Sequence, residues 1–341
     1  MDLADTGTVN VRPGQGTFRM AQAKLLAPGD PYRSVLFFRM SKLGSGRMPR
    51  IGSSVIDTAG VGLIHDWIAS LPAGSPDNNL AVERGQIATA IKALGTEAND
   101  KSRGQEIDKL LGSTPGAIRL LQAINRSELP AAAGQQAIRV AASHQVALVR
   151  DLFEQFLPEE KRVKRLGTTV RPEQILALEG SIERGRQVFF KTDGVQCRNC
   201  HKINGQGKEI GPDLSGVGLK NNRAQILESM LQPSKKIEPK WLAYVVETVQ
   251  GRVHTGLLIK KDDKEVVLKD AKDKLARIPA SDVDVMAPQQ KSLMPDLLVR
   301  DMTAQQVADL ITFLVSLKTK PKQNNEEKTT NQPVPSYKRK N

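Results

Sequence analysis

The sequence predicts a mainly α-helical protein with a small antiparallel β insert. Apolar residues recur every three or four positions over most of the chain, as on the buried face of a helix. Between about residues 241 and 279 that period shortens to two, and glycine or charged breaks separate the apolar runs, as in antiparallel strands. Aromatic residues are only 4% of the 341 residues, so we expect a core of Leu, Ile, Val and Ala.

Changes in period and composition divide the chain into four segments. Residues 1–72 start with a stretch punctuated by Gly and Pro and end in a short helix, and residues 73–170 form a helical linker region. Residues 171–318 hold helices on either side of the β insert. Residues 319–341 are expected to be a disordered basic tail, because they contain almost nothing to bury.

Capping residues predict where the helices begin and end in the linker region. Ser113 and Pro115 supply a cap and a first-turn proline for one helix. Another helix is expected from about Gln145 to Phe156, and Pro158 ends it.

The third segment carries its own helix signals. Pro172 opens a helix that is expected to reach Phe189, and a second helix is expected from Arg223 to Leu231. The last helix starts at Thr303, with which Gln306 can complete a capping box.

The net charge of +13 is concentrated at one end of the chain. Seven basic and two acidic residues from Lys318 to Asn341 give +5, which leaves a mild +8 for the other 317 residues. This distribution favours a moderately basic, solvated surface, with an acidic docking partner as the alternative. No nucleic-acid recognition motif is present, so we expect no nucleic-acid partner. No apolar run approaches the roughly 18 residues that a transmembrane helix needs.

Both cysteines of the chain lie in the run Cys197-Arg198-Asn199-Cys200-His201. Two random cysteines at this spacing, followed by histidine, are expected on the order of 10⁻⁴ of the time. Two thiols three residues apart can each add to one vinyl group of a haem, and the adjacent imidazole can then ligate the iron. The motif therefore predicts one covalent haem c, held by Cys197 and Cys200, with His201 as the proximal ligand.

Two other chemistries use a Cys-x-x-Cys pair. A zinc site would take three ligands from this motif, but no second Cys pair or spaced His pair follows it. A thioredoxin-like redox pair needs a strand before the motif and a helix after it, whereas a Gly-rich loop follows here. Both remain as alternatives to the haem hypothesis, as does a structural module without haem.

The loop after the motif contains Gly205-Gln206-Gly207 and Gly211-Pro212-Asp213-Leu214. Glycine lets a backbone pass close to the edge of a haem ring. A metal-bound histidine usually donates its second N–H to a fixed acceptor. The carbonyl of Pro212, on a backbone stiffened by proline, is our candidate for that acceptor, and an ordinary turn is the alternative.

A low-spin electron carrier needs a sixth iron ligand, and the soft thioether of methionine would raise its potential. Met294 is the favoured candidate, because it lies in the extended loop 292–295 and could reach over the distal face. Met286 is the main competitor. Met230 falls on an apolar helix stripe, and Met302 can pack as a hydrophobic staple, so both are expected in the core.

The remaining histidines, His65, His144 and His254, are isolated in the sequence and are expected to be surface or packed residues. No Ser-His-Asp ordering, phosphate loop or pair of carboxylates rises above background.

Residues 171 to about 318 resemble a class I cytochrome c, of the haem-binding domain type of planctomycetes and verrucomicrobia (Pirellula/Verrucomicrobium type). The likeness is carried by short motifs along the segment: Gly185 with Phe189, Cys197-Arg198-Asn199-Cys200-His201, Gly211-Pro212-Asp213-Leu214-Ser215, Pro233-Ser234-Lys235, Ser292-Leu293-Met294-Pro295 and Phe313-Leu314. The resemblance implies a cytochrome c fold and one covalent haem c with His201 and Met294 as axial ligands. It also implies that the first and last helices cross where Gly185 lets Phe313 approach.

Residues 1–72 are similar to the carboxy-terminal half of a second cytochrome c-like module that lacks its Cys-x-x-Cys-His half. The likeness is carried by Pro28-Gly29-Asp30-Pro31, Ser34, Arg39-Met40, Met48-Pro49, Gly52-Ser53, Asp57 and Trp67-Ile68. Met48 would be a distal ligand in an intact module, but it has no partner haem here. Since the chain also starts without a signal peptide, we expect it to be the tail of a longer exported protein, with a wrongly assigned start as the alternative.

The sequence thus predicts one-electron transfer through a covalently bound haem with His/Met ligation. We expect the electron-accepting module of a larger periplasmic or otherwise extracytoplasmic oxidoreductase, served by a redox partner protein or an upstream dehydrogenase domain. We expect no substrate site and no catalytic residues in this chain, because the haem carries the redox chemistry. The alternative is a haem enzyme or gas-binding sensor with an open distal site.

Overall fold

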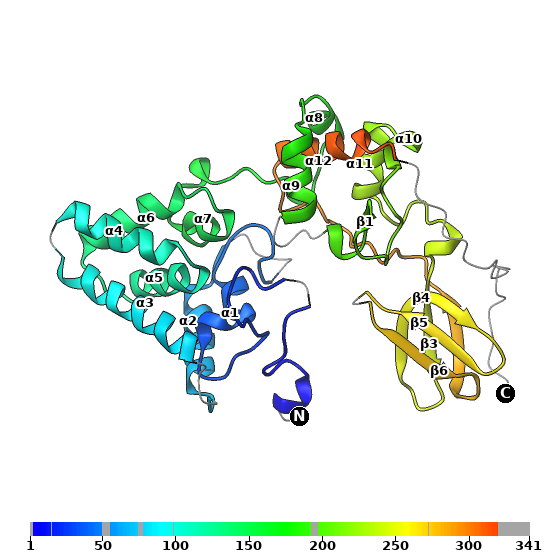
Figure 1. Ribbon diagram of the computed structural model, residues 1–341, viewed down its shortest axis with the longest axis horizontal. Coiled ribbons are helices and arrows are strands. Elements are labelled where there is room, and N and C mark those ends of the chain that lie inside the picture. Colours follow the sequence, from blue (N-terminus) through cyan, green and yellow to red (C-terminus); the bar gives the residue numbers. More distant parts are fainter. Residues whose placement is uncertain are drawn as a thin grey trace. The chain divides into compact units, whose positions relative to one another are not determined.

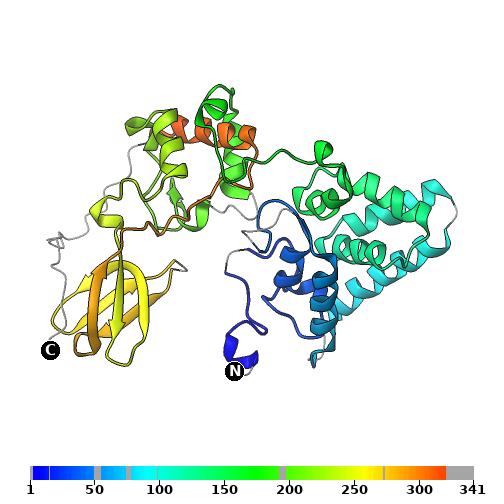
Figure 2. The same ribbon diagram turned by 180° about the vertical axis from the view of Figure 1, so that it is seen from behind.

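In a computed structural model the chain forms two compact units, Met1–Lys164 and Arg165–Asn341. The structure describes residues 3–14, 16–49, 55–73, 78–97, 99–191, 197–271 and 273–319. The predicted tail from residue 320 onward lies outside the described residues, as do Gly52 and Ser53 of the second likeness. Figures 1 and 2 show helices throughout the first unit and both helices and a sheet in the second.

The first unit is a set of helices around one core. Its helices are α1 (Val35–Met40), α2 (Thr58–Ser70), α3 (Asn78–Thr96), α4 (Asp100–Leu111), α5 (Thr114–Asn125), α6 (Ala131–Ala142) and α7 (Ala147–Phe153), with short 3₁₀ turns at Leu3–Thr6, Pro31–Arg33, Glu154–Phe156 and Glu159–Lys161. Phe38, Ile68 and Leu120 are fully buried in the same apolar cluster. The predicted segments 1–72 and 73–170 therefore both contribute to one core.

Several predicted helix ends in this unit are confirmed. The Ser113 side chain accepts a hydrogen bond from Gly116 N at the start of α5, with proline in the first turn. The helix expected to end before Pro158 is α7 with the 3₁₀ turn Glu154–Phe156. From Arg162 to Arg171 the chain has no helix, so the linker region is not helical to its end.

The helices of the second unit pack around α12 (Figure 1). They are α8 (Pro172–Leu176), α9 (Ile182–Lys191), α10 (Val217–Lys220), α11 (Arg223–Leu231) and α12 (Ala304–Ser316), with a 3₁₀ turn at Pro239–Trp241. The predicted helix Arg223–Leu231 is confirmed as α11, and the capping box between Thr303 and Gln306 is present at the start of α12.

The prediction of one helix from Pro172 to Phe189 is wrong in one respect, because the segment forms two helices, α8 and α9. Ser181 starts the second part: its Oγ accepts from Arg184 N at 3.3 Å, and its own N–H donates to Asp309 Oδ1 of α12 at 2.8 Å. These bonds satisfy backbone donors at a new helix start, so the chain turns where the apolar period alone predicts continuation.

Helix α9 crosses α12 at Gly185. An ideal Cβ on Gly185 would lie 2.0 Å from Asp309 O and 2.7 Å from Phe313 Cβ. Only glycine permits so close an approach of two helix backbones. This contact between Gly185 and Phe313 is the one that the resemblance implied.

The insert is a five-stranded antiparallel sheet with its own apolar core. Its strands are β3 (Ala243–Thr248), β4 (Val253–Lys261), β5 (Glu265–Lys269), β6 (Leu275–Pro279) and β7 (Val283–Pro288), in the order β6-β5-β4-β3-β7. Only the 3₁₀ turn Ala280–Asp282 joins β6 to β7, the two outermost strands, so the sheet must curl toward closure. The predicted end of the insert at residue 279 is too early, because β7 follows it (Figures 1 and 2).

Helices make up about 48% of the chain, so the mainly-α prediction is confirmed only in part: the sheet is larger than expected. Within the described ranges, every helix is too short or too polar to cross a bilayer.

Candidate haem site

The Cys-x-x-Cys-His motif forms one tight turn. Residues Cys197–Asn199 make a single 3₁₀ turn, and the backbone N–H groups of Cys200 and His201 both donate to Cys197 O, at 3.1 and 2.9 Å. Both cysteines and the histidine therefore project from one short piece of backbone. The five residues before the turn, 192–196, lie outside the described residues.

The two thiols are free and half-buried. Burial raises the pKa of Cys197 to about 12. Burial also raises the pKa of Cys200, against the opposing effect of the nearby Lys208 ammonium. Both groups are therefore neutral thiols at pH 7, and Cys197 packs against the apolar core of the second unit.

The imidazole of His201 is oriented by a backbone carbonyl. Its Nδ1 lies 2.9 Å from Pro212 O. Burial lowers the pKa of His201, although the hydrogen bond to Pro212 works in the opposite direction. In the neutral ring Nδ1–H donates to that carbonyl, which leaves the lone pair on Nε2 as the donor atom for a metal.

Gly211 lies in close contact with this ring. An ideal Cβ on Gly211 would lie 2.7 Å from His201 Cε1 and 3.0 Å from His201 Nδ1. The backbone N–H of Gly211 donates to Cys200 O at 2.8 Å, so the two ends of the loop are held together. The ring thus packs directly against peptide backbone, in a space that any larger residue would fill.

A hairpin that the sequence reasoning missed lies between the ligand turn and Pro212. Strands β1 (Lys202–Ile203) and β2 (Gln206–Gly207) pair through a two-residue turn at Asn204-Gly205, whose φ angles are +48° and +83°. Two successive positive φ angles define a type I′ turn, for which Asn-Gly is the preferred sequence. The Asn-Gly dipeptide was the signal that could have predicted it.

The four downstream methionines differ in their surroundings. Met230 and Met302 are buried in the core of the second unit, and Met286 is buried in the separate core of the β insert. Met294 is only partly buried and packs against the same apolar cluster as Cys197. Its backbone N–H donates to Ser292 Oγ at 3.1 Å, which holds the loop before α12.

No cluster of side chains that could hold a metal ion is found in the described part of the chain. No three His, Cys, Asp or Glu side chains converge there on a common point. His65 is buried and lies within hydrogen-bonding distance of Tyr32 and Asp66. His144 Nδ1 accepts from Val146 N, and His254 lies on β4.

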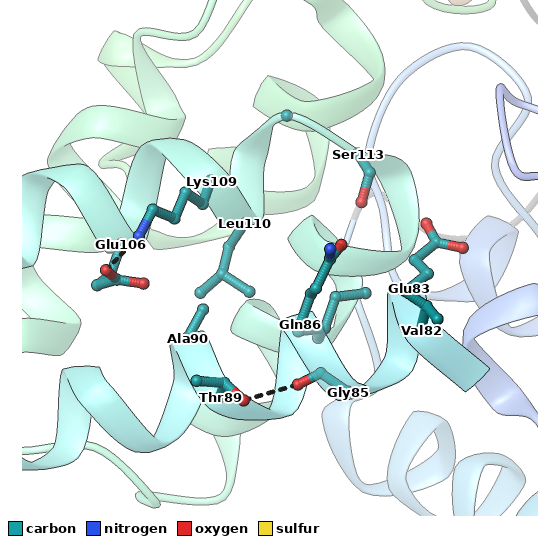
Figure 3. A pocket seen from close by; sticks show the side chains of 12 residues that line it. Val82, Glu83, Gly85, Gln86, Thr89, Ala90, Glu106, Lys109, Leu110 and Ser113 are labelled. Atoms are coloured by element: carbon teal, nitrogen blue, oxygen red, sulfur yellow. Dashed lines mark hydrogen bonds and ion pairs between the residues drawn. The ribbon is translucent and has the colours of Figure 1, made fainter. Parts of the chain in front are cut away.

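A groove of about 880 Å³ lies between α3 and α4 of the first unit (Figure 3). Glu106 and Lys109 on its wall pair with each other at 2.6 Å, and Thr89 Oγ1 donates to Gly85 O. Its lining includes no histidine or cysteine. The groove therefore lacks the thiol and imidazole groups that the turn at Cys197 brings together.

The residues of this turn fit a covalently attached haem. Two neutral, free thiols share a turn with an imidazole whose Nδ1 is engaged by a carbonyl and whose ring lies close to Gly211. This donor set is compatible with a c-type haem site, in which the two thiols would form the thioether bonds and the oriented imidazole would ligate the iron.

Comparison with known families agrees with this class. Residues 182–266 match the family model of cytochrome c, which supports a cytochrome c haem-binding domain with covalently bound haem and haem-based electron transfer. Such a domain also suggests an extracytoplasmic location in bacteria. The match runs from α9 into β5 and ends before Met294 and α12. No curated protein matches the chain.

Proposed function

We propose that residues 171 to about 318 bind one haem c and transfer single electrons through it. The observation that carries the proposal is the 2.9 Å contact between His201 Nδ1 and Pro212 O, within the turn that also holds both cysteines. Cys197 and Cys200 would tether the group, and His201 would bind iron through Nε2. The bound haem supplies the one-electron chemistry.

The chain's own residues set the conditions of that chemistry. The Pro212 carbonyl keeps the proton of His201 on Nδ1, so the imidazole presents Nε2 in a fixed direction. Gly211 lets the ring approach the loop closely, because a Cβ there would lie 2.7 Å from His201 Cε1. Burial of the apolar cluster against which Cys197 packs excludes water from one side of the site.

We assign the sixth ligand to Met294. The other three downstream methionines are enclosed in apolar cores, whereas Met294 is partly exposed on a loop beside the cluster that contacts Cys197. This difference in burial supports Met294 over Met286.

The proposed context is a larger exported oxidoreductase in the periplasm, with this domain passing electrons to or from a redox partner protein or an upstream dehydrogenase domain. The motifs quoted above support a planctomycete-type haem-binding domain. The likeness around Met48 supports a partial second cytochrome c-like module in residues 1–72, which would need a haem motif from elsewhere.

Expression in a host with cytochrome maturation tests the central claim. After denaturing electrophoresis, haem staining should remain on the protein band, with one iron per polypeptide. The double variant Cys197→Ser with Cys200→Ser should lose the stain while keeping its helical circular dichroism. A wild-type band without stain or iron would contradict the proposed function.

A matched pair of variants tests the sixth ligand. Met294→Leu should convert a six-coordinate low-spin spectrum to high spin, whereas Met286→Leu should leave the spectrum unchanged because Met286 lies in the core of the insert. The reverse result would assign the ligand to Met286. A wild-type protein that is already high spin and binds carbon monoxide would instead favour the open-site alternative.

A further inference from the structure

A buried hydroxyl lies in the loop just after Pro212, whose carbonyl orients His201. Ser215 is only 3% exposed, and its side chain lies three residues after Pro212. A hydroxyl in such a place costs free energy unless its hydrogen bonds are made. Its hydroxyl forms hydrogen bonds with two residues of the loop that carries the ligand.

The Ser215 hydroxyl joins three parts of this loop. Ser215 Oγ donates to Asp213 Oδ1 at 2.5 Å and accepts from Asn204 N at 2.7 Å. Asp213 Oδ1 also accepts from Ser215 N at 2.8 Å. The carboxylate and the hydroxyl therefore fold the backbone on the far side of Pro212 into a tight turn and fasten it to the hairpin.

This network connects the two chain segments that flank the site. Asn204 is the first residue of the type I′ turn, three residues after His201, whereas Asp213 directly follows Pro212. A second hydrogen bond, from Leu214 N to Lys202 O at 2.8 Å, joins the same two segments. The segment leaving His201 and the segment leaving Pro212 are thus tied together just beyond the Nδ1–carbonyl contact.

We propose that Ser215, with Asp213, is a positioning residue for the axial histidine. The pair fixes the direction of the Pro212 carbonyl, and through it the strength of the hydrogen bond from His201 Nδ1–H. This inference rests on the proposed function, since it assumes that His201 ligates the iron. Among the described residues, neither side chain forms a hydrogen bond to the imidazole itself.

The expected effect follows from how the second imidazole nitrogen tunes a metal. A strong hydrogen bond from Nδ1–H makes the imidazole a better electron donor and favours the oxidised metal. If Ser215→Ala loosens the carbonyl, donation weakens and the reduction potential shifts to a more positive value. The substitution adds or removes no formal charge, and the exchange of the His201 ring N–H reports on the hydrogen bond directly.

The test compares Ser215→Ala with Ser215→Thr and with Ser229→Ala in the haem-loaded protein. Ser229 is an exposed serine of α11 whose hydroxyl donates to Gln225 O in its own helix. We expect a positive shift in reduction potential and faster exchange of the His201 ring N–H, seen by proton NMR, in Ser215→Ala alone. Because Ser215→Thr keeps a hydroxyl, it should have the wild-type reduction potential and the wild-type exchange rate. An unchanged potential and unchanged ring-proton exchange in Ser215→Ala would overturn the inference.

A second pair decides the case if Ser215→Ala does not fold. Asp213→Asn and Asp213→Ala remove the same charge, but only asparagine keeps an oxygen that can accept from Ser215. We expect slow ring-proton exchange to survive in Asp213→Asn and to be lost in Asp213→Ala, and equal exchange in both would overturn the inference. If the inference about Ser215 fails but these variants still carry covalent haem with normal low-spin absorption, the proposed function stands. If the wild-type protein carries no haem, the proposed function and the inference about Ser215 both fail.

Discussion

Arg184 of α9 donates two hydrogen bonds to the buried carboxylate of Asp309 on α12, from Nε to Oδ2 and from Nη2 to Oδ1, both at 2.8 Å. Asp309 Oδ1 also accepts from Ser181 N and from Gln305 Nε2. One carboxylate therefore caps the start of α9 and joins it to α12, next to the crossing at Gly185.

These bonds make the packing of α9 on α12 depend on pH. Burial alone would raise the pKa of Asp309, but the hydrogen bonds from Arg184, Ser181 and Gln305 outweigh it and the pKa is lowered. A lowered folded pKa contributes stability above the unfolded value of about 3.9, and that contribution is lost as pH falls through the folded value.

We expect Asp309→Asn to reduce the hydrogen-exchange protection of α9 and α12 amides at pH 7 by about 1–3 kcal/mol. The difference from the wild type should shrink as pH falls from about 4 toward the lowered pKa of folded Asp309, because over that range the unfolded wild type binds a proton that the folded protein does not yet bind. Asp263→Asn, at an exposed turn of the insert, should show no such difference. A constant gap between pH 7 and pH 3 would contradict the role of the carboxylate.

A methyl group at Gly185 should also separate the two helices. Gly185→Ala would bring Cβ to 2.0 Å from Asp309 O, so a backbone must move, at a cost of roughly 1–3 kcal/mol. Gly62→Ala on α2 is the matched control, since a Cβ there meets nothing within 4 Å and should stabilise its helix by about 0.5–1 kcal/mol. Urea unfolding of both variants followed by circular dichroism measures the difference, and equal midpoints would contradict the tight crossing.

How far the sequence could predict this molecule depends on whether the relevant contact is local. The turn at Cys197 and the capping box at Thr303 depend on neighbouring residues, and both could be read from spacing. Strand β7 (Val283–Pro288) lies beyond the expected end of the insert, and it pairs with β3, which is distant in the sequence.

The shared core of the first unit is a second non-local feature. Phe38 and Leu120 belong to one buried cluster although 82 positions separate them in the numbering. The composition and the apolar period of the sequence indicate a boundary near residue 72. Neither of them can indicate that helices on the two sides of this boundary pack their apolar faces together. In the ligand loop, the acceptor at Pro212 was predictable from its stiff backbone, whereas Ser215 becomes meaningful only once the hairpin folds it against Asn204.

The contact between Gly211 and the ring of His201 gives a third prediction. Gly211→Ala would place Cβ 2.7 Å from His201 Cε1, so the ring must tilt or the loop must open. Attachment through the two cysteines should persist, but the fraction of low-spin haem should fall relative to the wild type. Gly104→Ala, whose Cβ would have 3.7 Å to its nearest neighbour, Gln136 Nε2, should keep the wild-type spectrum. A low-spin spectrum in Gly211→Ala would show that the loop accommodates the methyl group.

The last prediction concerns a buried ion pair in the first unit. Lys42 and Asp151 are 1% and 6% exposed, and Lys42 Nζ lies 3.2 Å from Asp151 Oδ2. Lys42 Nζ also donates to Ser45 O at 2.6 Å and lies 5.8 Å from the centre of the Phe38 ring. The pair thus fixes the segment after α1 against α7, at a position from which the ammonium cannot reach water.

Removing one partner should therefore cost more than removing both. Asp151→Leu would leave the Lys42 charge buried without its counter-ion, which costs about 3–5 kcal/mol, whereas replacing both by apolar residues of similar size is often neutral or stabilising. We expect the double variant Lys42→Met with Asp151→Leu to unfold at a higher urea concentration than Asp151→Leu alone. The coupling energy from the full double-mutant cycle checks this, and additive effects would mean that the two charges do not interact in the folded protein.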